Sequence, residues 1–145
     1  MPDLRPQLAW TDVSPADVVT PVMLEVTLRR LVHNAGAAWD LFPGHHDRDY
    51  AQANGHTDVF ANTSLLLAVV DRMVTDWAGP HTQIARRSLT MGLPVHAGDC
   101  LQASGVVIER RRDGGLYVVD IDTELSTARG RCAHGTTSIV LPGQP

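Results

Sequence analysis

NTSLLLAVVDRMVTDWAGP, the sequence of residues 62–80, predicts a helix at the centre of the protein. Its first three residues are of types that cap helix N-termini, and its final Gly-Pro pair is typical of a helix end. Between these signals, residues 65–70 are all apolar, so the first half of the helix has no polar face. A surface helix needs such a face. We therefore expect residues 65–70 to be almost wholly buried.

The sequence after this helix has the character of β-strands. Strands are expected over residues 88–93, 99–110, 116–125 and 131–141. In the third segment apolar residues or Thr alternate with Asp or Glu, which is the pattern of a strand with one buried face. Asp113-Gly114-Gly115 predicts a hairpin turn before it. Together these features predict an α+β fold in which a curved antiparallel sheet wraps around one long buried helix.

The sequence before the helix is less regular. We expect, in order, an irregular lead-in over residues 1–20, a strand and a short helix over 22–39, a loop over 40–47, and one or two helical turns over 47–53. Pro43-Gly44 is a strong turn signal and accounts for the loop. No repeat, low-complexity segment or linker interrupts the sequence, so a single domain over residues 1–145 is expected.

The composition argues against nucleic-acid and membrane partners. Among 145 residues, 12 Lys and Arg stand against 16 Asp and Glu, a net charge of −4, and only 5% are aromatic. Such a chain offers neither a basic surface for phosphates nor aromatic platforms for bases. The longest apolar run, residues 65–70, is far shorter than the roughly 20 residues of a membrane-spanning helix. No apolar segment follows the N-terminus, so we expect a cytoplasmic protein.

Cysteines and histidines give no pattern of a metal site. Cys100 and Cys132 lie in apolar stretches without metal-ligand spacing, which favours buried thiols in a reducing compartment. His45, His46 and His56 lack a further ligand at helical spacing. We therefore expect no bound metal.

Asp40 and His45 are the candidate catalytic residues. Four residues separate them across a turn that contains Pro43, so their side chains can face the same small pocket. A carboxylate and an imidazole can hold one water between them, with one group accepting its proton and the other orienting the water or returning a proton. Histidine suits either role near neutral pH because its ordinary pKa is about 6.5. Taken alone, the pair is also typical of solvated loop residues.

A longer motif surrounds this pair. Residues 40–47 read DLFPGHHD and are followed by Tyr50-Ala51, Gly55 and the predicted helix. This order resembles the hydratase motif of the MaoC-like hot-dog family, which has the form Asp-x-Asn-Pro-x-His-x-Asp, an aromatic-Ala pair, a Gly and a buried helix. The runs DVFAN at 58–62 and VTDWAGP at 74–80 are similar to the smaller subunit of heteromeric steroid side-chain enoyl-CoA hydratases.

The resemblance implies a hot-dog fold and a hydro-lyase. By this resemblance Asp40 and His45 bind the water that adds to the double bond of a 2-enoyl-CoA with a bulky, steroid-derived acyl chain. The position whose backbone N–H polarises the thioester carbonyl falls on Thr63. Free N–H groups and a positive dipole end at the start of a helix suit an enolate oxygen. The CoA thioester is the substrate, and no cofactor is implied.

The resemblance also implies a protein partner. We expect a second hot-dog chain, in a heteromer or a homodimer, with the acyl-CoA thioester along the seam between the chains. Exposed strand edges tend to be paired, and ligand pockets favour such seams. Asn62 is a candidate substrate contact because the steroid-type subunits carry Asn at this position. Arg86 and Arg87 are candidate contacts for CoA phosphates, with a solvated strand end as the alternative interpretation.

Three positions depart from the motif. Phe42 replaces the motif Asn, while Asn62 and Thr63 stand where ordinary hydratases have His-Gly. A side chain at position 63 narrows the approach to the backbone N–H. Two alternatives therefore stay open: a non-catalytic hot-dog subunit that supports a partner hydratase, and a homodimeric dehydratase of another acyl thioester, as in polyketide assembly.

Overall fold

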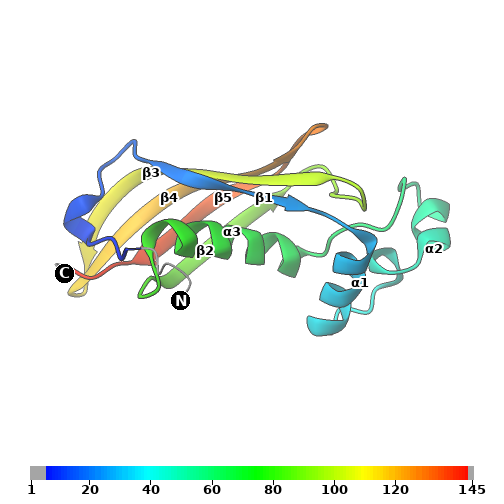
Figure 1. Ribbon diagram of the computed structural model, residues 1–145, viewed down its shortest axis with the longest axis horizontal. Helices are drawn as coiled ribbons and strands as arrows, with labels where there is room; N and C mark the ends of the chain where they lie inside the picture. Colours follow the sequence, from blue (N-terminus) through cyan, green and yellow to red (C-terminus); the bar gives the residue numbers. More distant parts are fainter. Residues whose placement is uncertain (1–5, 144–145) are drawn as a thin grey trace.

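The computed structural model describes residues 6–143, and it confirms the α+β class. A five-stranded antiparallel sheet curves over one side of a long helix (Figure 1). The strands are β1 (Val18–Glu25), β2 (Gln83–Met91), β3 (Cys100–Asp113), β4 (Leu116–Thr127) and β5 (Gly130–Val140). The helices are α1 (Leu28–Ala37), α2 (Arg48–Ala53) and α3 (Thr63–Ala78), with 3₁₀ turns η1 (Trp10–Asp12) and η2 (Pro43–His45). The strand order is β1-β3-β4-β5-β2, so β1 and β2 form the edges.

The predicted central helix is α3. It begins after Asn62, whose side chain accepts a hydrogen bond from the Leu65 N–H at 3.0 Å. It ends at Gly79, whose φ of +104° is a conformation that favours glycine. The expected burial of residues 65–70 is wrong at Leu67, which is half-buried, and at Ala68, which is exposed. The reason is that the sheet covers α3 from one side only (Figure 1).

The strand β4 alternates as its sequence predicts. Val119, Ile121 and Leu125 are fully buried in the core, and the acidic residues between them lie on the opposite face of the sheet. The predicted hairpin joins β3 to β4 through Gly114 and Gly115, which have φ values of +55° and +85°. The apolar face of β4 therefore lies in the core with α3, and its acidic residues lie on the outer face of the sheet.

The N-terminal segment is more ordered than the irregular lead-in that was expected over residues 1–20. The strand β1 already begins at Val18, and Ala9 and Val13 are buried in the core. The Trp10 indole N–H donates to the Val118 carbonyl at 3.1 Å and ties this segment to β4. The expectation of irregular structure therefore holds for residues 6–17 apart from η1 and is wrong only at residues 18–20, while the scattered apolar residues pack across the end of the sheet. Residues 1–5 lie outside the described part.

The two cysteines differ in burial. Cys132 is buried as expected, but Cys100 is exposed at the start of β3. The strand alternates, and Leu101 and Ala103 occupy its core-facing side. Cys100 therefore falls on the outer face, and the prediction of two buried thiols is wrong for this residue.

The segment between β1 and α3 forms one end of the molecule. There, α1, η2 and α2 lie beyond the sheet and beside the N-terminus of α3 (Figure 1). The expected helical turns over residues 47–53 are confirmed as α2, and the Asp47 side chain caps them by accepting from the Tyr50 N–H at 3.1 Å. An isolated antiparallel bridge pairs Phe60 with His96 and joins this end to the loop before β3.

Candidate active site

Asp40 and His45 lie side by side at the helical end of the molecule. The His45 Nε2 is 3.4 Å from the Asp40 Oδ2, with side-chain exposures of 10% and 42%. Asp40 follows α1, where its backbone N–H donates to the Ala35 carbonyl at 2.9 Å. His45 ends the turn η2 that Pro43 begins. The turn predicted from Pro43-Gly44 thus brings the two candidate catalytic side chains together.

The protonation of the His45 ring follows from its other neighbour. Its Nδ1 lies 2.8 Å from the backbone oxygen of Phe60. A carbonyl oxygen can only accept, so the hydrogen of the neutral ring is on Nδ1 and Nε2 carries a lone pair. In the neutral ring, two acceptors, Nε2 and the Asp40 carboxylate, therefore face each other. A molecule with two O–H bonds, such as water, can donate one hydrogen to each.

Aromatic rings hold His45 in place. The ring of Phe42 meets it edge-on at a centroid distance of 5.4 Å, and the ring of Phe60 at 5.0 Å. Tyr50 packs against the far side of Phe42 at 5.6 Å. A Cβ on Gly44 would lie 2.7 Å from both phenylalanine rings, so any larger residue would displace at least one of them. Where the family motif has a polar Asn, this chain uses Phe42 and fixes the loop through ring contacts.

The N-terminus of α3 lies beside Asp40 and His45. The Asn62 Oδ1 accepts from the Leu65 N–H at 3.0 Å, from the Asn34 Nδ2 at 2.5 Å and from the Ser64 hydroxyl at 2.9 Å. The backbone donor fixes which end of the amide is oxygen. The Asn62 Nδ2 is then buried without a hydrogen-bond partner among the described residues. The Thr63 N–H, in the first turn, has no partner within the helix.

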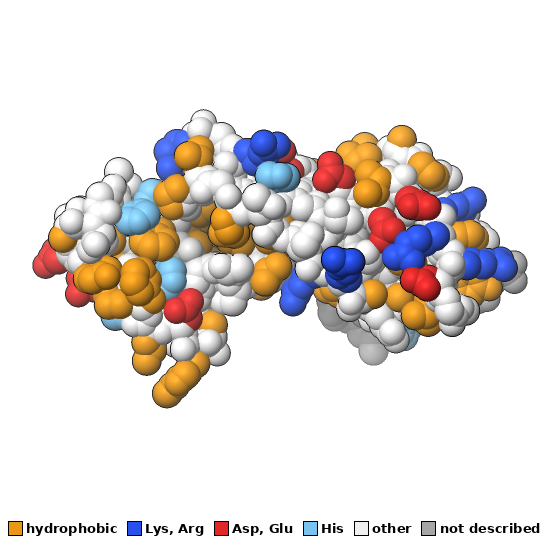
Figure 2. All heavy atoms as spheres, turned by 180° about the vertical axis from the view of Figure 1, so that it is seen from behind, with side chains coloured by type: hydrophobic (Ala, Val, Ile, Leu, Met, Phe, Trp, Pro, Cys, Tyr) orange, Lys and Arg blue, Asp and Glu red, His pale blue; other side chains and the backbone are white. Residues whose placement is uncertain are grey.

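One cleft of about 380 Å³ joins these groups. Asp40, His45, Asn62 and Thr63 line it. The remaining lining residues include His56 and a set of mainly apolar side chains: Phe60, Leu66, Met91, Leu93, Pro94 and Val95. Figure 2 shows hydrophobic and histidine side chains gathered at the end of the molecule that carries α1 and α2. The cleft therefore combines an acid/base pair and a helix N-terminus with an apolar wall.

Arg86 and Arg87 lie outside this cleft. Both are in the edge strand β2, and neither lines the cleft. Arg87 forms an ion pair with Asp71 of α3, and Arg86 is exposed. Their suggested contact with CoA phosphates therefore has no support from the shape of this site.

Two residues of the site, His56 and Asn34, were not predicted from the sequence. His56 lines the cleft, and Asn34 of α1 holds the Asn62 side chain. Neither stands at a motif spacing, because tertiary packing brings them to the site from other elements. Within residues 6–143 no group of three or more His, Cys, Asp or Glu side chains is placed to hold a metal ion. No helix in the same part of the chain is long and apolar enough to cross a membrane.

Comparison with known proteins places the chain in a family, although no family model matches it. A segment of 77 residues, 53% of the chain, is 43% identical to the 3-oxo-4,17-pregnadiene-20-carboxyl-CoA hydratase beta subunit of Mycobacterium tuberculosis and spans 60% of that relative's length. A chain of the ChsH1-ChsH2 complex from the same organism is 30% identical with a TM-score of 0.81, over 88% of this chain and 98% of that one.

A third comparison supports the fold. The MaoC-like dehydratase from Rhodospirillum rubrum superposes with a TM-score of 0.81 over 95% of this chain and 99% of that one. At 19% identity this likeness shows the fold alone. The 30% identity to a chain of the mycobacterial complex extends over 98% of that chain. This likeness is sufficient to show family membership. The chain belongs to the MaoC-like hot-dog family.

Proposed function

We propose that this chain is an enoyl-CoA hydratase that adds water to the double bond of a 2-enoyl-CoA. The observation that carries the proposal is the 3.4 Å contact between the His45 Nε2 and the Asp40 Oδ2 at the N-terminus of α3. The pair can hold a nucleophilic water, and the helix N-terminus can polarise a thioester. These are the two requirements for addition to an α,β-unsaturated thioester.

The water step uses the lone pair on the His45 Nε2. A water that donates one hydrogen to Asp40 and one to His45 keeps an oxygen lone pair for carbon 3 of the acyl chain. As the new carbon–oxygen bond forms, the π electrons of the double bond move toward the thioester oxygen, and His45 takes the proton. The same imidazolium can return that proton to carbon 2, so the addition is balanced and redox-neutral.

The helix N-terminus supports the enolate stage. The Thr63 N–H has no intrahelical acceptor, and the positive end of the helix dipole favours a developing negative charge. The Asn62 Nδ2 is a buried donor that lacks a partner among the described residues, and a thioester oxygen would satisfy it. We assign to these two donors the polarisation of the carbonyl. The scheme uses no metal and no redox cofactor.

The acyl group in this proposal is bulky and steroid-derived. The support is the sequence identity to the mycobacterial hydratase beta subunit, whose name specifies a pregnadiene carboxyl-CoA. The cleft wall agrees with an apolar ligand, since Leu66, Met91 and Leu93 contribute to it. Met91 and Leu93 are 50% and 42% exposed, so they are available to a large acyl chain or to a partner.

The proposal includes a second hot-dog chain. The edge strand β2 pairs only with β5 among the described residues, and none of its nine residues is fully buried. Met91, at the end of this strand, also lines the cleft. A chain that docked along β2 would therefore complete the wall of the site. The mycobacterial relative of known structure forms a ChsH1-ChsH2 complex, which favours a heteromer.

The test is a hydration assay on the purified chain, alone and together with the protein encoded by the neighbouring gene. Loss of the enoyl-thioester absorbance is followed with crotonyl-CoA and with a steroid side-chain enoyl-CoA. We expect hydration of the steroid substrate, which Asp40→Asn removes. Hydration by the pair that survives Asp40→Asn would instead assign the chain as a non-catalytic subunit. Activity on crotonyl-CoA alone would refute the steroid assignment.

A further inference from the structure

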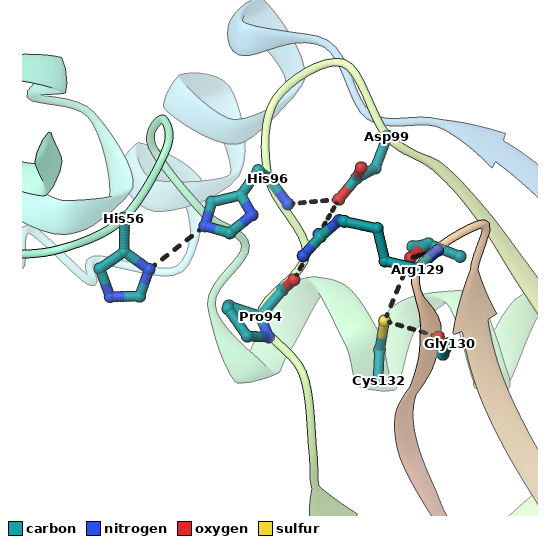
Figure 3. Close-up of polar contacts among 8 residues, drawn as sticks. His56, Pro94, His96, Asp99, Arg129, Gly130 and Cys132 are labelled. Carbon is teal, nitrogen blue, oxygen red and sulfur yellow. Dashed lines mark hydrogen bonds and ion pairs between the residues drawn. The ribbon is translucent and has the colours of Figure 1, made fainter.

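A pair of histidines extends from the wall of the cleft into the protein, with His56 at the wall and His96 behind it. The His56 Nδ1 is 3.2 Å from the His96 Nε2, so one of these nitrogens donates and the other accepts (Figure 3). His56 lines the same cleft as Asp40 and His45. It stacks on the ring of Phe60 at a centroid distance of 4.1 Å, with 25° between the planes. His96 is only 7% exposed.

The position of the shared hydrogen follows from the unused nitrogen of His96. Its Nδ1 is buried and has no hydrogen-bond partner among the described residues. A buried N–H without an acceptor is rarer and more costly than an unused acceptor. The hydrogen of His96 is therefore on Nε2, from where it donates to the His56 Nδ1. His56 must then carry its own hydrogen on Nε2, the ring nitrogen that does not face His96.

The surroundings keep His96 neutral and fixed. Burial, and then the nearby charge of Arg129, lower the pKa of His96, while Asp99 opposes them. Asp99 is itself engaged, because its Oδ2 accepts from the His96 backbone N–H at 2.8 Å and from Arg129 at 2.5 Å. Arg129 also donates to the Pro94 carbonyl at 2.7 Å. Figure 3 shows these contacts bracing the loop that carries His96.

We propose that His56 is a neutral hydrogen-bond donor that binds the carbonyl oxygen of the acyl thioester in the cleft, together with the donors of Asn62 and Thr63, and that His96 keeps its own hydrogen on Nε2. The identity of the ligand rests on the proposed hydratase function. The assignment of the tautomer does not, because it follows from the two ring contacts and the buried Nδ1. His56 thus contributes binding, and the proton transfers stay with Asp40 and His45.

The first experiment is NMR of the ¹⁵N-labelled protein. Long-range proton–nitrogen spectra identify which ring nitrogen of each histidine carries hydrogen. We expect Nε2 for His56 and His96, and Nδ1 for His45. Addition of butyryl-CoA, a saturated thioester that cannot be hydrated, should shift the His56 Nε2 resonance.

Each outcome of this experiment has a definite meaning. A hydrogen on the His56 Nδ1 would overturn the inference, whatever the enzyme does. Butyryl-CoA shifts at His45 without any at His56 would overturn it and leave the hydratase proposal standing. The absence of shifts at both histidines would count against the acyl-CoA ligand itself.

The second experiment separates binding from proton transfer. His56→Phe keeps a ring on Phe60 but removes the donor, so KM for the enoyl-CoA should rise about tenfold while kcat changes little. The shape of the pH–rate profile should stay as in the wild type. His96→Leu should raise KM similarly, and His96→Gln, which keeps an N–H at this reach, should restore much of it.

The opposite result would reassign the residue. If His56→Phe removes a limb of the pH–rate profile, His56 transfers protons and the inference is wrong. A hundredfold fall in kcat with an unchanged profile would also overturn the inference, because His56 would then stabilise the transition state rather than contribute binding alone. Melting temperatures of the variants show whether the fold is retained. The NMR assignment in the wild-type protein keeps the inference testable even if a variant fails to fold.

Discussion

His45 donates from Nδ1 to the backbone oxygen of Phe60 across 2.8 Å, and this contact decides which ring nitrogen faces Asp40. Because the acceptor belongs to the main chain, rotation of the Phe60 side chain cannot remove it. In the neutral ring the lone pair on Nε2 is therefore directed at the carboxylate.

Removing either member of the pair should abolish most hydration. Asp40→Asn and His45→Ala should each lower kcat/KM by about a hundredfold or more, because one water needs both groups. His81→Ala is the control, since His81 is exposed beyond the far end of α3. Steady-state assays and circular dichroism check activity and fold. Near-wild-type turnover in Asp40→Asn or His45→Ala would remove that residue from the mechanism.

The burial of α3 predicts a contrast between two positions on one helix. Leu66 is 2% exposed in the core, whereas Ala68 is exposed on the free side of the helix. Leu66→Asp should prevent soluble expression because it places an unpaired charge in the core. Ala68→Asp should express and melt close to the wild type. Soluble, folded Leu66→Asp protein would contradict the packing described here.

Substitutions of Asn62 should distinguish its capping of α3 from its proposed contact with the substrate. Its Oδ1 caps α3, and its Nδ2 is the buried donor that we assign to the substrate. Asn62→Ala should cost about 1 kcal/mol of unfolding free energy through loss of the cap. Asn62→Ser retains a capping oxygen and should unfold at higher urea concentration than Asn62→Ala. If Asn62→Ser hydrates enoyl-CoA as fast as the wild type, Nδ2 has no part in catalysis.

Burial of His96 should make the folded state sensitive to mild acid. Burial and the charge of Arg129 lower its pKa in the folded chain, whereas the unfolded chain keeps the ordinary value of about 6.5. The unfolded state then binds the proton more readily, so stability falls as the pH drops below about 6.5 and continues to fall until the lowered pKa is reached. Above that window His96 contributes no pH dependence.

The measurement is urea unfolding at several pH values above and below this threshold. His96→Gln should show a shallower loss of stability in acid than the wild type, because it removes one titrating group. Equal slopes for the two proteins would show that the pKa of His96 is not lowered by folding.

The partner prediction can be tested with two matched methionines. Met91 on β2 is 50% exposed and Met23 on the opposite edge strand β1 is 56% exposed. If the second chain docks along β2, Met91→Glu should weaken assembly in light scattering, and Met23→Glu should not. The reverse result would place the interface on β1. A monodisperse monomer with full hydratase activity would end the claim that the site needs a partner.

Local signals in the sequence predict the central helix and the C-terminal hairpins well. The apolar run after Asn62, the alternation over residues 119–125 and the Gly114-Gly115 turn each describe a structure that depends on nearby residues. The N-terminal segment was not predictable in this way. Ala9 and Val13 reach the core only because the far end of the sheet is there to receive them, and no periodic pattern records such contacts.

In the candidate site, too, the local contacts could be predicted from the sequence and the long-range contacts could not. The spacing of Asp40 and His45 across the Pro43 turn predicts their contact, because a short loop limits how far apart they can be. The partner of the His45 Nδ1, the carbonyl of Phe60, lies 15 residues away. His96 is 40 residues from His56. These contacts depend on the folded arrangement of the bridge between Phe60 and His96, and no single stretch of sequence encodes them.

The use of main-chain atoms to orient His45 and to polarise the substrate has an evolutionary consequence. The carbonyl of Phe60 orients His45, and in our proposal the N–H of Thr63 polarises the substrate. Neither atom changes when the side chain at its position changes. Position 63, unlike position 60 with its ring contacts to His45 and His56, can therefore vary during divergence and reshape the mouth of the cleft. A lineage could in this way acquire a new acyl-chain preference while its catalytic chemistry stays constant.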